Sequence, residues 1–203
     1  MTAGYVLPLY PLYGFVLLPT QKVEVTPTGP VASELIRRAA RYDGQLVASF
    51  FEDEAVHEVG VRARVFPMEG EQEAAIFEGV SRCRLLELVA EDVPMVRAED
   101  FPDHLRPRER QEAVRRLLLR RFGRLFWERE REFCRKLAGL TLDRLTWQIT
   151  PSLNLELEQQ QGLLNLADPV ARGQVLLLAI KELERREKFL RPFAWLRKGG
   201  QWN

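Results

Sequence analysis

The apolar pattern near the N-terminus is that of a strand. Residues 7–18 are mainly apolar, but Pro8 and Pro11 interrupt the run and Pro19 ends it. Because proline lacks the amide donor and moves the residue before it into extended conformations, this pattern excludes a helix and predicts a strand with prolines at its start or edge. We expect later segments to bury its apolar side chains. These are Leu7, Leu9, Tyr10, Leu12, Phe15, Val16, Leu17 and Leu18.

Short apolar runs then continue as far as residue 103. Val31, Leu35 and Ala39 recur at helical spacing, which predicts one helix that ends at Asp43-Gly44. Further strands are predicted at residues 22–26, 45–51, 58–67, 74–77, 82–89 and 95–98.

Turn signals separate these predicted strands. Residues 52–55 and 68–71 are expected to be loops, and residues 78–81 a turn in which Gly79 can take positive φ. About six short strands around one helix predict a small closed or half-closed barrel rather than a parallel sheet with alternating helices.

The pattern after residue 103 is helical. No proline occurs from Arg108 to Leu137, and apolar residues recur there at steps of three and four, which predicts one long helix. These residues are Val114, Leu117, Leu118, Phe122, Leu125, Phe126, Phe133 and Leu137.

Three more helices are predicted after it. One covers residues 142–149, and a second runs from a cap at Asn154 to about residue 166. Asp168 followed by Pro169 is a strong signal for the start of a third, which reaches about residue 189. The sequence therefore predicts an α+β protein with a β-rich domain at residues 1–103 and an α-helical bundle at residues 104–203.

Charge is distributed unevenly between these halves. The net charge of the chain is +1, but residues 1–103 hold 9 Lys or Arg against 17 Asp or Glu, and residues 104–203 hold 21 against 12. Either the halves attract each other, or the basic half faces an acidic partner, or its arginines form a solvated helical surface.

The sequence favours a soluble cytoplasmic protein without a targeting segment. The first basic residue is Lys22, and the prolines would break the apolar core of a signal peptide. No run approaches the roughly 20 apolar residues of a membrane span. Cys83 and Cys134 lie far apart, so neither a disulfide framework nor a cysteine metal site is expected.

No catalytic, cofactor or metal motif stands out in the sequence. A phosphate-binding loop would need a glycine-rich string ending in Lys and Ser or Thr, which is absent. His57 and His104 are isolated, both cysteines have the neighbours of buried side chains, and the carboxylates of residues 52–54 lie in a predicted solvated loop. We expect a protein that is not an enzyme.

The order of several short motifs resembles a known family. Leu-Pro-Leu-Tyr-Pro-Leu at 7–12 and Val-Leu-Leu-Pro at 16–19 precede a helix, Glu-Val-Gly-Val at 58–61, Glu-Gly-Val-Ser-Arg-Cys-Arg-Leu at 78–85 and Leu-Asn-Leu-Glu at 153–156. This order resembles the N-terminal, substrate-binding domain of Lon proteases over almost the whole chain. The residues that carry it are Leu7, Pro8, Leu9, Leu12, Pro19, Gly60, Gly79 and Arg82.

The resemblance implies both a fold and a function. The implied fold is a PUA-like pseudobarrel followed by a helical bundle, and the implied function is the binding of protein substrates or partners. The sequence departs from the family at Tyr13-Gly14, where Arg is common, and at residues 23–26, which replace a Pro-Leu pair. The sequence has neither the ATPase nor the Ser-Lys protease module, so we expect a stand-alone module.

A surface that binds apolar segments of client or partner proteins would be an apolar patch ringed by charge. Core packing is the alternative for each candidate residue. The candidates are Tyr10, Tyr13, Phe51, Phe66, Pro67 and Met68.

Two other functions remain open at this point. One is nucleic-acid binding by the arginine-rich helix, in which Arg116, Arg120 and Arg124 share a side with Arg115 and Arg121 near them. The acidic first half would repel a polyanion. The other is a hydrolase of unknown type.

Overall fold

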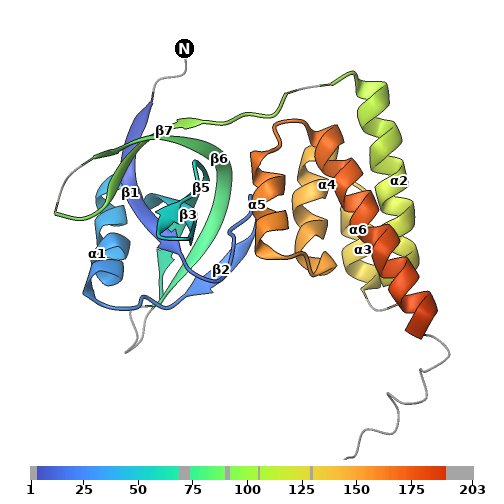
Figure 1. Ribbon diagram of the computed structural model, residues 1–203, viewed down its shortest axis with the longest axis horizontal. Coiled ribbons are helices and arrows are strands. Elements are labelled where there is room, and N and C mark those ends of the chain that lie inside the picture. The colour runs from blue at the N-terminus through green and yellow to red at the C-terminus, as the bar shows by residue number, and fades with distance from the viewer. Residues whose placement is uncertain (1–3, 69–73, 90–91, 105, 129, 191–203) are drawn as a thin grey trace, which may run out of the picture. The chain divides into compact units, whose positions relative to one another are not determined.

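The computed structural model describes residues 4–68, 74–89, 92–104, 106–128 and 130–190. The chain forms two compact units, the first made of Met1–His104 and Glu156–Asp168 and the second of Leu105–Leu155 and Pro169–Asn203 (Figure 1). A β-rich part followed by a helical part confirms the predicted α+β class. The predicted loop tip at 69–71 and the tail with Trp195 and Trp202 lie outside the described residues.

The first unit is built on a seven-stranded sheet. Five described strands follow one another as antiparallel neighbours in the order β1, β7, β6, β5 and β3. The first and last of them, β1 and β3, pair in parallel, so the five strands close into a ring. β2 pairs with β6, and β4 pairs with β3. The strands are β1 (Tyr5–Leu12), β2 (Lys22–Val25), β3 (Gln45–Glu52), β4 (Ala55–Val56), β5 (Val59–Pro67), β6 (Ala75–Val89) and β7 (Met95–Asp100).

The first part of the proline-rich N-terminal run forms β1, as its pattern predicts, but the strand ends at Leu12 and residues 13–18 are not in a strand. Seven of the run's eight expected core side chains are buried, and Phe15 is half-buried. Leu7 and Leu9 pack in one cluster with Val47 of β3 and Cys83 of β6. Residues 7–10 of β1 are all buried, so the strand is covered on both faces, and Leu7 and Leu9 lie in this cluster. The helix α1 (Pro30–Ala39), followed by a short 3-10 turn η1 (Ala40–Tyr42), packs against β1.

The predicted turn at residues 78–81 is wrong, because β6 runs through it as one strand of 15 residues. Arg62 pairs with Ser81 and Ala63 with Gly79, so Val80 is the extra residue of a β-bulge. Gly79 lets the backbone of residues 18–19 come close to β6 and does not form a turn. A Cβ at this position would lie 2.2 Å from the backbone oxygen of Leu18.

The second unit contains the helices α2 (Arg108–Phe126), α3 (Arg131–Leu137), α4 (Leu142–Ile149) and α6 (Pro169–Leu190), with a 3-10 segment η2 (Thr150–Leu153). α6 begins at Pro169, as the Asp168-Pro169 signal predicts. In the described part of the chain, none of the helices combines the length and the apolar character needed to cross a membrane.

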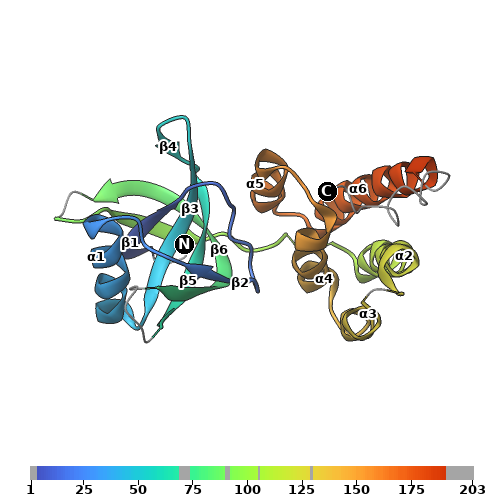
Figure 2. The same ribbon diagram turned by 90° about the horizontal axis from the view of Figure 1, so that it is seen from below.

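The single long helix predicted over residues 108–137 is wrong, because the chain turns between α2 and α3 (Figure 2). The ring of Phe122 stacks on Phe126 with centroids 4.4 Å apart and meets Phe133 edge-on at 6.1 Å. On one continuous helix Phe122 and Phe133 would be about 16 Å apart along the axis. The apolar contact between these two rings therefore requires the reversal.

The helix α5 (Leu157–Asn165) belongs to the first unit, although the sequence-based division at residue 103 assigned it to the helical bundle. The side-chain amide of Gln161 donates to the backbone oxygen of Val59 at 2.8 Å, so this helix completes the β-rich unit. The predicted cap at Asn154 is also wrong. Asn154 has φ +48 at the end of η2, and Glu156 caps α5 in a capping box with Gln159.

Both cysteines are buried. Burial raises the pKa of the Cys83 thiol in β6 to about 12. We expect neither Cys83 nor Cys134 to react with a thiol reagent within minutes at pH 8, and both to react after unfolding in guanidinium. The folded state holds the Cys83 proton more tightly than the unfolded state, so stability should fall as pH rises above about 8.5 toward 12. Fast reaction of Cys83 at pH 8 would mean that β6 opens in the native protein.

Candidate binding site: an apolar pocket beside β1 and α1

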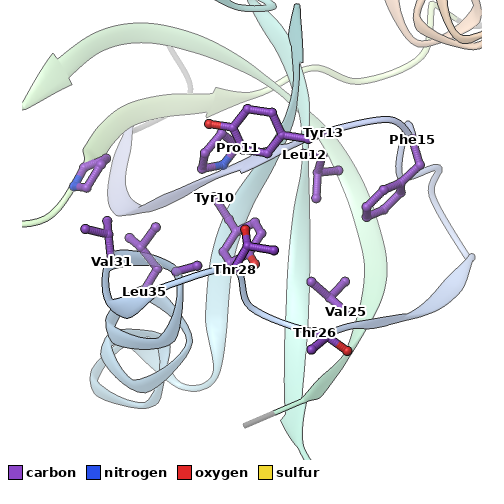
Figure 3. Close-up of a pocket in the computed structure, with 12 residues that line it drawn as sticks. Tyr10, Pro11, Leu12, Tyr13, Phe15, Val25, Thr26, Thr28, Val31 and Leu35 are labelled. Atoms are coloured by element: carbon purple, nitrogen blue, oxygen red, sulfur yellow. The ribbon is translucent and has the colours of Figure 1, made fainter. Parts of the chain in front are cut away.

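An apolar pocket of about 330 Å³ lies in the first unit, beside β1 and α1. Figure 3 shows Val31 and Leu35 of α1 on one side of it, Phe15 and Val25 on the other, and Tyr10 between them. The lining is completed by Pro11, Leu12, Tyr13, Thr26, Thr28, Ala32 and Pro94.

The end of β1 places two tyrosines at different depths of this pocket. Tyr10 is 6% exposed and meets the ring of Phe77 edge-on, with centroids 5.0 Å apart. Burial, followed by the proximity of Tyr13, raises the pKa of the Tyr10 hydroxyl. After β1 the chain turns at Gly14, which has φ +76, and Tyr13 is left 61% exposed. Tyr10 is therefore part of the floor and Tyr13 part of the mouth.

Phe51 connects the mouth of the pocket to a neighbouring hairpin. Its ring lies 4.9 Å from that of Tyr13, centroid to centroid. Phe51 is near the end of β3 and pairs with Val56 of β4. Of the six predicted contact residues, Tyr10 and Tyr13 thus line the pocket, and Phe51 lies next to it in contact with Tyr13.

The other three candidates lie at the end of β5 and do not line the pocket. Phe66 and Met68 are each 40% exposed, and Pro67 between them is exposed. The ammonium of Lys22 lies 5.9 Å from the centroid of the Phe66 ring. The structure therefore separates the predicted surface into two patches.

Sequence reasoning missed the contribution of α1 to the site. Val31 and Leu35 recur at the same helical spacing, but Val31 is 55% exposed at the pocket, whereas Leu35 is buried. Helical spacing groups these two side chains on one face. The signal that separates them is position, because Val31 lies in the first turn and Leu35 in the second.

The residues that carry the family resemblance lie at structural positions. Leu7, Pro8, Leu9, Leu12 and Pro19 are all buried. A Cβ at Gly60 would lie 2.8 Å from the backbone oxygen of Ala48. Neighbouring strands therefore need a residue without a side chain here.

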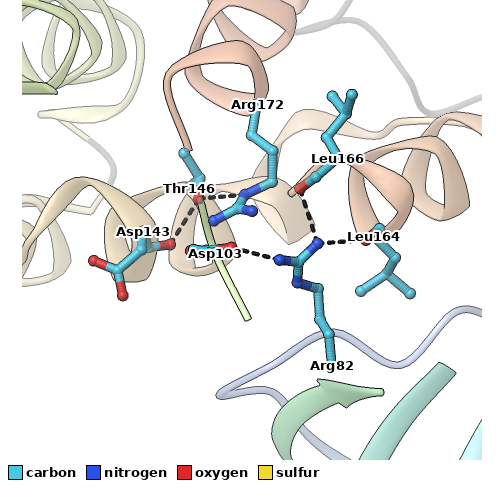
Figure 4. A network of polar contacts seen from close by, with 7 residues as sticks. All are labelled: Arg82, Asp103, Asp143, Thr146, Leu164, Leu166 and Arg172. Atoms are coloured by element: carbon cyan, nitrogen blue, oxygen red, sulfur yellow. Dashed lines mark hydrogen bonds and ion pairs between the residues drawn. The ribbon is translucent and has the colours of Figure 1, made fainter. Parts of the chain in front are cut away.

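Arg82 is a buried anchor inside the first unit (Figure 4). Its Nη1 donates to the backbone oxygens of Leu164 and Leu166 at 2.7 and 2.8 Å, and its Nη2 lies 2.5 Å from an oxygen of Asp103. The guanidinium also lies 4.6 Å from the ring centroid of Phe101. Arg82 therefore ties α5 and the end of the β-rich segment to β6.

A separate buried arginine stabilises the second unit (Figure 4). Arg172 of α6 is fully buried, and its guanidinium lies 4.2 Å from the ring centroid of Trp147 in α4. Its Nε is 3.4 Å from the hydroxyl of Thr146. These contacts join α4 to α6.

Several arginines proposed for nucleic-acid binding are held in ion pairs within the second unit. Arg115 pairs with Glu112 at 2.9 Å and donates to the backbone oxygen of Leu140 at 2.6 Å. Arg121 pairs with Glu184 at 2.7 Å. Contacts of this kind reduce the positive charge that would be available to phosphates.

Within the described residues, no group of three or more His, Cys, Asp or Glu side chains could hold a metal ion. His57 has Glu52 as its neighbour, with Nε2 3.7 Å from a carboxylate oxygen, and its ring stacks on Phe50 at 5.3 Å. The apolar pocket is thus the candidate site.

Comparisons with known proteins agree with this fold. The family model described as the ATP-dependent protease La (LON) substrate-binding domain matches residues 6–182. The N-terminal domain of the Mycobacterium avium complex Lon protease superposes with a TM-score of 0.76 and 19% identity over 87% of this chain and 98% of that one. A Lon N-terminal domain protein from Xanthomonas campestris superposes with a TM-score of 0.63 and 20% identity, over 86% of this chain and 98% of that one. A search of curated proteins finds no match.

The family model covers most of both compact units, so the match includes the helices as well as the sheet. The resemblance carried by the β1 motif, Gly60, Gly79 and Arg82 is confirmed by this match. The chain belongs to the family of the ATP-dependent protease La (LON) substrate-binding domain.

Proposed function

We propose that this protein is a non-catalytic binding module that holds exposed apolar segments of client or partner proteins in the pocket beside β1 and α1. The observation that carries the proposal is the pocket itself, which has a floor of buried apolar side chains and an exposed aromatic side chain at its mouth. The family supports binding of protein substrates in general.

The size and lining of the pocket fit a short apolar segment. A volume of about 330 Å³ is at the lower end of the roughly 300–1,000 Å³ of ligand sites, which is room for one or two side chains. Tyr13 and Val31, both more than half exposed, would lose water on contact. Burial of apolar surface contributes about 25 cal/mol per Å², and aromatic side chains commonly dominate such interfaces.

We expect Tyr13→Asp to weaken binding of a permanently unfolded protein about five-fold or more, because a charge at the mouth would be desolvated by an apolar segment. Tyr13 is largely exposed, so the variant should fold normally. The measurement is a titration of labelled, reduced and alkylated α-lactalbumin, with folding checked by circular dichroism.

The matched control is Phe66→Asp, which puts the same charge on the exposed aromatic residue of the other patch. It should leave binding unchanged. If Phe66→Asp weakened binding and Tyr13→Asp did not, the contact surface would be the end of β5. If the unfolded protein bound neither variant nor the parent chain, the proposed function would be wrong.

A further inference from the structure

An acidic hairpin stands next to the mouth of the pocket. β3 and β4 are joined by the two residues Asp53 and Glu54, because Glu52 pairs directly with Ala55. Asp53 and Glu54 have φ values of +48 and +64, as in a two-residue turn of type I′, and both are exposed. Figure 2 shows this hairpin extending from the rest of the sheet.

The hairpin and the pocket are in direct contact through Tyr13 and Phe51, whose ring centroids are 4.9 Å apart. Asp53 follows Phe51 by two residues, which is about 7 Å along a strand. An extended peptide covers the same length in two residues. With the 4.9 Å between the two rings, the span from the mouth to Asp53 is about 12 Å, which two or three extended residues together with a Lys or Arg side chain can cover.

The first unit as a whole carries a negative net charge, as the hairpin does. Met1–His104 and Glu156–Asp168 together hold 9 Lys or Arg against 20 Asp or Glu, a net charge of −11. Glu34 of α1, which also belongs to this unit, has basic neighbours and pairs with Arg37 and Arg38.

We propose that the pocket takes an extended protein segment in which an apolar anchor side chain lies two or three residues from a Lys or Arg, and that Asp53 and Glu54 bind that basic side chain. This inference rests on the proposed function and narrows it from apolar segments in general to apolar segments with basic flanks. Complementary charge beside an apolar pocket supplies orientation and discrimination between partners.

The test uses three fluorescein-labelled peptides that share one Phe-Leu core. They differ only in the residue at the second and third positions on each side of this core. These positions carry Lys in the first peptide, Gln in the second and Glu in the third. The full chain should bind the Lys peptide about five-fold more tightly than the Gln peptide at low salt, and the Glu peptide more weakly than either. The preference should shrink at about 0.5 M salt, because exposed ion pairs are screened.

The decisive variant is Asp53→Asn with Glu54→Gln, which removes both charges. Asn tolerates positive φ at least as well as Asp, so the turn should be preserved. The double variant should bind the Lys peptide as weakly as the Gln peptide and leave the Gln peptide's affinity unchanged. The control, Glu87→Gln with Glu99→Gln, removes two charges of the same unit that do not line the pocket and should retain the preference.

Each outcome separates the inference from the proposed function. Equal binding of all three peptides, lost in Tyr13→Asp, would overturn the basic-flank inference and leave the proposed function intact. No binding of any peptide or of the unfolded protein would overturn both. If sedimentation showed a dimer that Tyr13→Asp dissociates, the pocket would be occupied by a second copy of the chain, and the inference would be overturned.

Discussion

Replacing Gly79 with alanine is expected to lower the free energy of unfolding by about 3 kcal/mol. The added Cβ would lie 2.2 Å from the backbone oxygen of Leu18 and 3.3 Å from Cα of Pro19. Both are backbone atoms, so no side-chain rotation can relieve the overlap. Two hydrogen bonds hold the segments at this separation, from the Thr20 amide to Gly79 at 2.8 Å and from the Gly79 amide to Gln21 at 2.9 Å.

The control for this prediction is Gly162→Ala in α5. A Cβ there would have no atom within 4 Å, and alanine is favoured over glycine in a helix by about 1 kcal/mol. Thermal unfolding followed by circular dichroism should show a lower melting temperature for Gly79→Ala and an equal or higher one for Gly162→Ala. A Gly79→Ala protein as stable as the parent would mean that β6 and residues 18–19 can separate at little cost.

The second large effect is expected for Arg82→Met. The substitution keeps most of the side-chain volume but leaves the carboxylate of Asp103 and the backbone oxygens of Leu164 and Leu166 without the charged donor that they share. Removing one partner of a buried charged network typically costs about 3–5 kcal/mol. We expect a loss of this size in urea unfolding, with faster amide exchange in α5 and at its C-terminal end.

Arg84→Met is the matched control, because Arg84 lies two residues away on β6 and its guanidinium is also close to Phe101, at 4.7 Å from the ring centroid. Arg84 is exposed, so its loss should cost less than about 1 kcal/mol. Equal effects of the two substitutions would show that the contact with Phe101, and not the hydrogen bonds of Arg82, stabilises this region.

Local signals in the sequence were sufficient for several elements. Pro8 and Pro11 restrict their own backbone geometry and exclude a helix, so β1 follows from them directly. Asp168-Pro169 is likewise a local signal, and α6 begins where it predicts. Periodicity predicts a small barrel but does not specify which strands pair. The order of the family motifs supports the prediction of a barrel, because the resemblance implies a pseudobarrel.

Other features depend on contacts between distant residues and could not be predicted locally. A glycine suits a turn and a close approach equally well, and only the position of Leu18 shows which applies to Gly79. The assignment of α5 to the first unit depends on Gln161 and Val59, which are 102 residues apart. The different depths of Tyr10 and Tyr13 were not predictable from alternation, because β1 is buried on both faces.

The interrupted course of the first unit has a consequence for synthesis on the ribosome. The strands end by residue 104, but the unit also needs Glu156–Asp168, so residues 105–155 must be translated before it is complete. Until then Arg82 lacks the oxygens of Leu164 and Leu166. Domains of most nascent chains can fold in order from the N-terminus, whereas here the first unit is complete only after the first segment of the second unit has been translated.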